Sequence, residues 1–64
     1  MKELEAKIST RVTNNIPLYR TPKGSSGTIV FDYRTGITVR WDKSHDTDDF
    51  DKKTELKFLN ILEE

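Results

Sequence analysis

The feature that most constrains the fold of this chain is a pair of alternating apolar runs joined by a tight turn. In residues 28–34, apolar side chains occupy every second position from Ile29 to Tyr33, and β-branched or aromatic types predominate. Residues 37–42 repeat the alternation, and Gly36 supplies the backbone freedom that a tight turn needs. The two runs therefore predict a β-hairpin with one apolar face that forms the core. The predicted face consists of Ile29, Phe31, Tyr33, Ile37, Val39 and Trp41.

Length and composition limit what can surround this hairpin. A chain of 64 residues, 33% of them hydrophobic, forms one domain at most, because a unit of this size buries only about 60% of the surface that its unfolded chain exposes. The sequence contains no cysteine, so neither disulfides nor a thiolate zinc site can supplement the core. Packing of the hairpin must therefore supply most of the stability.

The distribution of charged and apolar residues bears on location and partners. No run approaches the roughly 20 apolar residues that span a bilayer, and residues 1–4 lack the apolar stretch of a signal peptide. We therefore expect a cytoplasmic protein, complete as written, that does not bind membranes. The 11 basic residues balance the 11 acidic ones, so the net positive charge that attracts nucleic acids is absent.

The chain before the hairpin predicts a lead-in, a strand and a long loop. Residues 1–7 favour helix locally, but so short a helix is not stable alone in water, and we expect a flexible lead-in. From Ile8 to Thr13 the alternation predicts a first strand. Residues 16–27 contain two prolines and two glycines, which are typical of a loop. The single domain is expected to span residues 8–62.

The chain after the hairpin predicts a polar loop and an ambiguous end. Residues 43–51 are strongly polar and acidic, so we expect a solvated loop anchored only by Phe50. In residues 52–64, leucines three residues apart from Leu56 to Leu62 fit a helix, while the same segment also alternates as a short strand. Local propensity alone favours the helix.

The order of these elements resembles the small Src-homology-3-like (KOW-like) β-barrel proteins of bacteria and phages, which are largely uncharacterised. Gly27-Thr28-Ile29-Val30 and Val39-Arg40-Trp41-Asp42 are similar to the Gly-Thr-Val and Val-x-Trp-Asp segments of those barrels. The resemblance covers residues 8–62. It implies a mainly β protein, a five-stranded barrel with one short helical turn within residues 50–56 and a final strand at residues 57–61 that pairs with the first. On this basis we expect the strand ending rather than the helix.

The acidic segment and the polar residues do not predict catalysis or metal binding. His45 is followed by four aspartates within residues 46–51. Counting a calcium loop from Asp42, the sixth and twelfth positions hold Thr47 and Lys53 instead of glycine and glutamate. No nucleophile is paired with a base, and the glycines of residues 24–27 precede a strand, not a phosphate-binding helix. We therefore expect no metal, no cofactor and no enzyme activity.

Basic residues offer one candidate site, for nucleic acid. Together with aromatic side chains they could line one side of a barrel as a stacking groove. The zero net charge predicts weak attraction to phosphate, so this hypothesis depends on whether the basic residues cluster on one face. The candidate nucleic-acid-binding residues are Arg11, Arg20, Lys23, Arg34 and Arg40.

Aromatic and acidic residues offer the other candidate site, for a protein partner. Small barrels bind partners through aromatic residues near their loops, and the acidic segment could present negative charge to a basic partner. For Trp41 itself a core position is the stronger interpretation, since it is the largest side chain of the hairpin. We expect a non-catalytic protein-binding or accessory module, with a nucleic-acid-binding barrel as the alternative. The candidate partner-binding residues are Tyr19, Trp41, Phe50, Asp48 and Asp49.

Overall fold

The computed structural model describes residues 1–18 and 21–62. In these residues the chain forms five strands and two single turns of 3-10 helix, and it contains no α-helix. The strands are β1 (Arg11–Asn14), β2 (Ser26–Asp32), β3 (Gly36–Trp41), β4 (Thr47–Asp51) and β5 (Leu59–Ile61). The 3-10 turns are η1 (Glu3–Glu5) and η2 (Leu56–Phe58).

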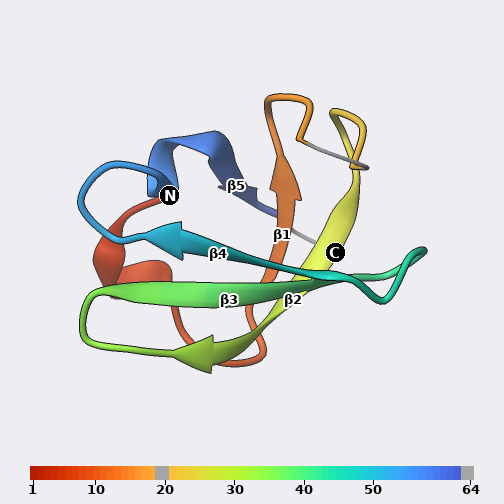
Figure 1. Cartoon of the computed structure of the whole chain (residues 1–64). Coiled ribbons are helices and arrows are strands. Elements are labelled where there is room, and N and C mark those ends of the chain that lie inside the picture. The colour runs from red at the N-terminus through yellow and green to blue at the C-terminus, as the bar shows by residue number, and fades with distance from the viewer. Residues whose placement is uncertain (19–20, 63–64) are drawn as a thin grey trace.

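The five strands form one antiparallel sheet in the order β4-β3-β2-β1-β5. The sheet curls into a half-barrel, and in the view of Figure 1 β5 and the end of β1 lie above β3. In the described part of the chain β4 and β5 are the edges of this sheet. The prediction of a mainly β fold with five strands and one short helical turn before the last strand is confirmed.

The core lies inside the curl and draws on every strand. Trp41 and Phe50 pack edge to face at its centre, with ring centroids 6.4 Å apart. The remaining members come from the strands, from η2 and from the segment before β1. The buried cluster consists of Ala6, Val12, Ile29, Ile37, Val39, Trp41, Phe50, Leu56 and Leu59.

The predicted inner face of the hairpin is right for β3 and wrong for half of β2. Ile29 pairs with Val39, but Phe31 pairs with Thr38, so β2 holds one residue more than β3 across this stretch. This β-bulge at Val30 moves the following side chains to the opposite face of the sheet. Phe31 and Tyr33 are each 53% exposed. The sequence prediction that they belong to the core is therefore wrong.

The first strand begins later than predicted. A turn precedes it, closed by the bond from the N–H of Thr10 to the carbonyl oxygen of Lys7 at 3.1 Å, with Ser9 at a φ of 78°. Because this turn breaks the alternation, Ile8 is exposed and β1 starts at Arg11. The inward positions of β1 are Val12 and Asn14.

Residues 1–7, which the sequence analysis places outside the domain, lie against the core. Ala6 is 1% exposed, and the amino group of Met1 donates to the carbonyl oxygens of Leu56 and Leu59 at 3.1 and 2.9 Å. Figure 1 shows this segment beside η2. It therefore covers one end of the half-barrel.

The acidic segment is a strand for half of its length, not the loop that its composition predicts. Residues 47–51 form β4 and pair with β3 along their whole length. Asp48 and Phe50 occupy its more buried positions, and the aspartates between and beyond them are exposed. Pairing with β3 and burial of Phe50 thus outweigh the low β propensity of aspartate.

The end of the chain forms η2 and β5, as the resemblance implies and against local helix propensity. β5 pairs with β1, with Leu59 opposite Asn14 and Ile61 opposite Val12. This pairing completely buries Leu59 and satisfies backbone groups on the second side of β1. Tertiary contacts therefore decide a segment that fits both a helix and a strand locally.

Hydrogen bonds from Asn14 anchor the loop between β1 and β2. The side-chain Nδ2 of Asn14 donates to the carbonyl oxygens of Ile16 and Pro22 at 2.8 and 3.1 Å. Its main-chain carbonyl oxygen accepts the N–H of Gly24 at 3.0 Å. Asn14 is 2% exposed, so water does not readily replace these bonds. One amide therefore joins both ends of the described loop to β1.

Replacing Asn14 with alanine is expected to destabilise the fold by about 2 kcal/mol, because two partly buried carbonyl groups lose their donor. Asn14→Asp should cost more, since a carboxylate would face the same two carbonyl oxygens. Urea unfolding monitored by Trp41 fluorescence measures both changes. Lys23→Ala, an exposed change in the same loop, serves as the control. Equal unfolding midpoints for Asn14→Ala and the control would contradict this role.

Candidate functional site

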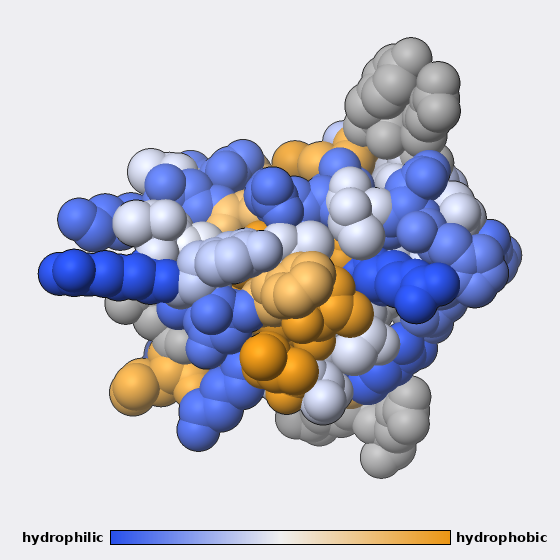
Figure 2. All heavy atoms as spheres, turned by 60° about the horizontal axis from the view of Figure 1, so that its bottom comes forward, coloured by the Kyte–Doolittle hydropathy of each residue, from blue (hydrophilic) through white to orange (hydrophobic). Residues whose placement is uncertain are grey.

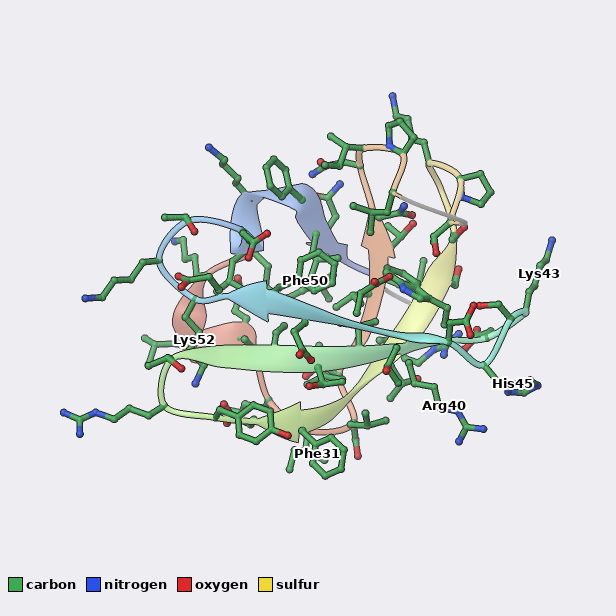
Figure 3. All side chains as sticks on the ribbon, viewed as in Figure 1. Phe31, Arg40, Lys43, His45, Phe50 and Lys52 are labelled. Atoms are coloured by element: carbon green, nitrogen blue, oxygen red, sulfur yellow. The ribbon has the colours of Figure 1, made fainter. Side chains whose placement is uncertain are left out.

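Two of the predicted partner-binding residues lie in the core. Trp41 is 2% exposed and Phe50 3% exposed, and Figure 3 shows Phe50 on the inner side of β4. The indole Nε1 of Trp41 donates to Asp48 Oδ2 at 2.6 Å. Trp41 is therefore a core residue, which is the stronger of the two interpretations from sequence. Neither the Trp41 ring nor the Phe50 ring is accessible to a partner.

The predicted acidic residues lie on opposite faces of β4. Asp48 accepts the indole hydrogen bond from Trp41 and is half-buried. Asp49 is exposed on the outer face, where its Oδ1 accepts the hydroxyl of Thr38 at 2.6 Å. Tyr19, the remaining member of this set, lies outside the described residues. Of the described candidates, only Asp49 presents its carboxylate on the outer sheet surface.

Arg11, the first of the predicted nucleic-acid-binding residues, is engaged with an acid. Its guanidinium bonds both carboxylate oxygens of Asp42, at 2.8 and 2.5 Å, and also donates to the hydroxyl of Thr28 at 2.7 Å. The hydrogen bond from Arg11 lowers the pKa of Asp42 below its ordinary value. This carboxylate therefore offsets the charge that Arg11 would offer to a phosphate.

The other described members of the basic set lie in three different segments of the chain. Lys23 lies in the loop before β2 and Arg34 in the turn after it, so the length of β2 separates them. Arg40 is exposed on β3, and its Nη2 lies 3.3 Å from His45 Nδ1. Arg20 lies outside the described residues. Register places Arg11 and Arg40 on the same face of the sheet, on either side of Thr28. The structure thus brings together only these two of the four described basic residues.

A pair of aromatic rings on the outer face was missed by the sequence analysis. Phe31 and Tyr33 are stacked with ring centroids 5.9 Å apart and an interplanar angle of 22°. Figure 3 shows Phe31 pointing away from the interior, and Figure 2 shows apolar side chains gathered at the centre of this face, bordered by hydrophilic ones. We call Phe31 and Tyr33 the aromatic patch. The alternation in the sequence gave no signal for it, because the bulge at Val30 leaves the pattern of residue types unchanged.

A shallow hollow of about 290 Å³ lies beside the aromatic patch. Its lining combines Tyr33 with three acidic residues and four others: Asp49, Asp51 and Glu55, and Thr35, Gly36, Ile37 and Phe50. Each carboxylate accepts a hydrogen bond from a neutral donor, and none forms an ion pair within the described residues. The hollow therefore combines an aromatic wall with uncompensated negative charge.

The described residues show neither a metal site nor a membrane span. They contain no group of three or more His, Asp or Glu residues placed to hold a metal ion. Among them, no helix has the length and apolar character needed to cross a bilayer. Comparison of the chain with protein-family models, with curated proteins and with solved structures found no match. The function must therefore be argued from the geometry of the chain itself.

Proposed function

We propose that this protein is a non-catalytic protein-binding module of the Src-homology-3-like barrel class, and that its partner docks on the aromatic patch. The observation that carries this proposal is that two stacked rings, each 53% exposed, lie on the outer sheet face. Aromatic residues are enriched in the centres of protein interfaces. Single exposed apolar side chains are common on protein surfaces, but apolar side chains that adjoin one another, as these two rings do, mark an interaction site.

The surroundings of the patch favour a protein partner over a nucleic acid. Asp49 and Asp51 line the hollow beside it, and carboxylates there would repel a phosphate backbone. The pairing of Arg11 with Asp42 and the separation of Lys23 from Arg34 weaken any basic groove. Absence of cysteine is consistent with a reducing compartment, and we place the module in the cytoplasm, in a bacterial or phage setting.

The test is selection of short peptides from a random displayed library, followed by affinity measurement on matched variants. A double variant in which both Phe31 and Tyr33 are replaced by serine is expected to bind the selected peptides about thirtyfold more weakly or worse, as after the loss of an interface hot spot. The fold should persist, since both rings are half exposed. Leu4→Ser removes an apolar side chain elsewhere that is even more exposed, at 86%, and should leave affinity unchanged.

Two results would count against this function. The double serine variant could bind the same peptides as tightly as the unaltered protein, which would remove the aromatic patch from the site. Alternatively, the protein could bind single-stranded DNA or RNA with an affinity that falls steeply with salt and is lost in the double serine variant. That second result would establish the nucleic-acid alternative.

A further inference from the structure

We propose that the hollow beside Tyr33 receives the cationic side chain of a lysine or arginine from the docked partner segment. The partner is then an extended peptide that carries a basic residue next to apolar residues. This inference rests on the proposed function, because it assigns the chemistry of the partner at the same outer face. The aromatic patch would bind the apolar residues, and the three carboxylates would bind the cation.

Strand register places the aromatic and acidic walls on either side of β3. The N–H of Tyr33 donates to the carbonyl oxygen of Gly36 at 2.8 Å, and Gly36 pairs with Asp51. Neighbouring strands lie about 4.8 Å apart, so Tyr33 and Asp51 flank Gly36 from the two adjacent chain segments. Glu55, from the turn before η2, completes the acidic wall.

Gly36 also lines the hollow and contributes only backbone to it. One row further along, Phe31 pairs with Thr38, and Thr38 pairs with Asp49. Thr38 is buried between its neighbours and bonded to Asp49. At Gly36 an added Cβ would lie 2.6 Å from the backbone carbonyl oxygen of Phe50, so the close approach of β4 excludes a side chain there. Tyr33 and the three carboxylates are therefore the aromatic and charged side chains that line this hollow.

The carboxylates of the hollow retain capacity for a cation. Asp51 Oδ1 accepts the N–H groups of Lys53 and Thr54 at 2.7 and 3.3 Å, and Glu55 Oε1 accepts the N–H of Asp51 at 3.0 Å. Each side chain keeps a second oxygen and further lone pairs for other donors. Lys52 is bonded to Asp32 at 2.5 Å and so does not neutralise them.

An ammonium or guanidinium group fits both walls of this hollow. Carboxylates form charge-assisted hydrogen bonds with either group, and the face of a tyrosine ring attracts a cation within about 6 Å of its centre. A metal ion does not fit, because the described residues hold no set of three ligands close enough together. The occupant is therefore an organic cation, and on this face it comes from a protein side chain.

The experiment uses the same displayed random-peptide library and compares isosteric amide variants. We expect the selected peptides to contain lysine or arginine close to apolar residues. Replacing that basic residue with glutamine in the best synthetic peptide should weaken binding about tenfold at low ionic strength, and less as salt rises. In Asp49→Asn/Asp51→Asn/Glu55→Gln, which keeps the hydrogen-bond acceptors, the two peptides should bind equally.

The control variant is Asp46→Asn, which changes the charge by the same sign in the turn before β4 and should preserve the tenfold difference. If the triple variant fails to fold, Glu55→Gln alone should at least halve the difference. Selected peptides that lack basic residues but lose affinity in the double serine variant would overturn the cationic assignment and leave the proposed function standing. Peptides bound equally well by the double serine variant would overturn both.

Discussion

Replacing Trp41 with alanine is expected to remove most of the free energy that keeps this protein folded at room temperature. The ring is 2% exposed and packs edge to face on Phe50, and removing a buried tryptophan costs about 3 to 5 kcal/mol. Asp48 would also lose the indole donor that bonds it at 2.6 Å. At about 0.1 kcal/mol per residue, a chain of 64 residues has a total stability of roughly 6 kcal/mol, so this single change removes most of it.

Far-UV circular dichroism and urea unfolding measure the effect, since the alanine variant lacks the only tryptophan. Trp41→Phe separates the two contributions, because it keeps an aromatic ring in the core but removes the indole N–H. This variant should remain folded and lose about 1 to 2 kcal/mol. An alanine variant with the unfolding midpoint of the unaltered protein would show that the assigned core is wrong.

The parts of the fold that could be predicted from sequence are those in which local pattern and tertiary contacts agree. In β3, β-branched residues and tryptophan alternate with polar residues, and Ile37, Val39 and Trp41 are all buried. In β4 the two disagree, because aspartates favour a loop while pairing with β3 and burial of Phe50 favour a strand. The last segment fits both helix and strand, and local propensity favours the helix, so the pairing with β1 decides for the strand.

The candidate site depends on the β-bulge at Val30, which the sequence pattern does not predict. Without the bulge at Val30, Phe31 and Tyr33 would point into the half-barrel with Ile29, as their alternation predicts. With it, they face solvent, while Trp41 and Phe50 fill the interior. Aromatic residues are therefore easy to name as candidates from sequence, but which of them faces a partner depends on a shift in register. Bulges arise from how two strands pair, so alternation within one strand carries no record of them.

Replacing Gly27 with alanine is expected to cost about 3 kcal/mol or more, as overpacking of a rigid core does. A Cβ at this position would lie 2.8 Å from both the carbonyl oxygen of Arg40 and Val39 Cγ1, and 2.9 Å from Trp41 Cε3. Gly27 pairs with Trp41 on one side and with Val12 on the other. Neither strand can move away without breaking the ladder that encloses the core. Only glycine therefore fits at position 27, because β3 approaches it too closely for a side chain.

Gly24→Ala is the matched control for Gly27→Ala, because it adds the same methyl group where there is space for it. Gly24 has no atom within 4 Å of the added Cβ, but its φ is +88°, so the cost arises from backbone conformation alone and should be about 1 kcal/mol. Urea unfolding of the two variants by Trp41 fluorescence compares these costs directly. If Gly27→Ala destabilised the protein no more than Gly24→Ala, β2 and β3 would have to separate easily at this point. The half-barrel would then be too loosely packed at Gly27 to hold Trp41 as the centre of its core.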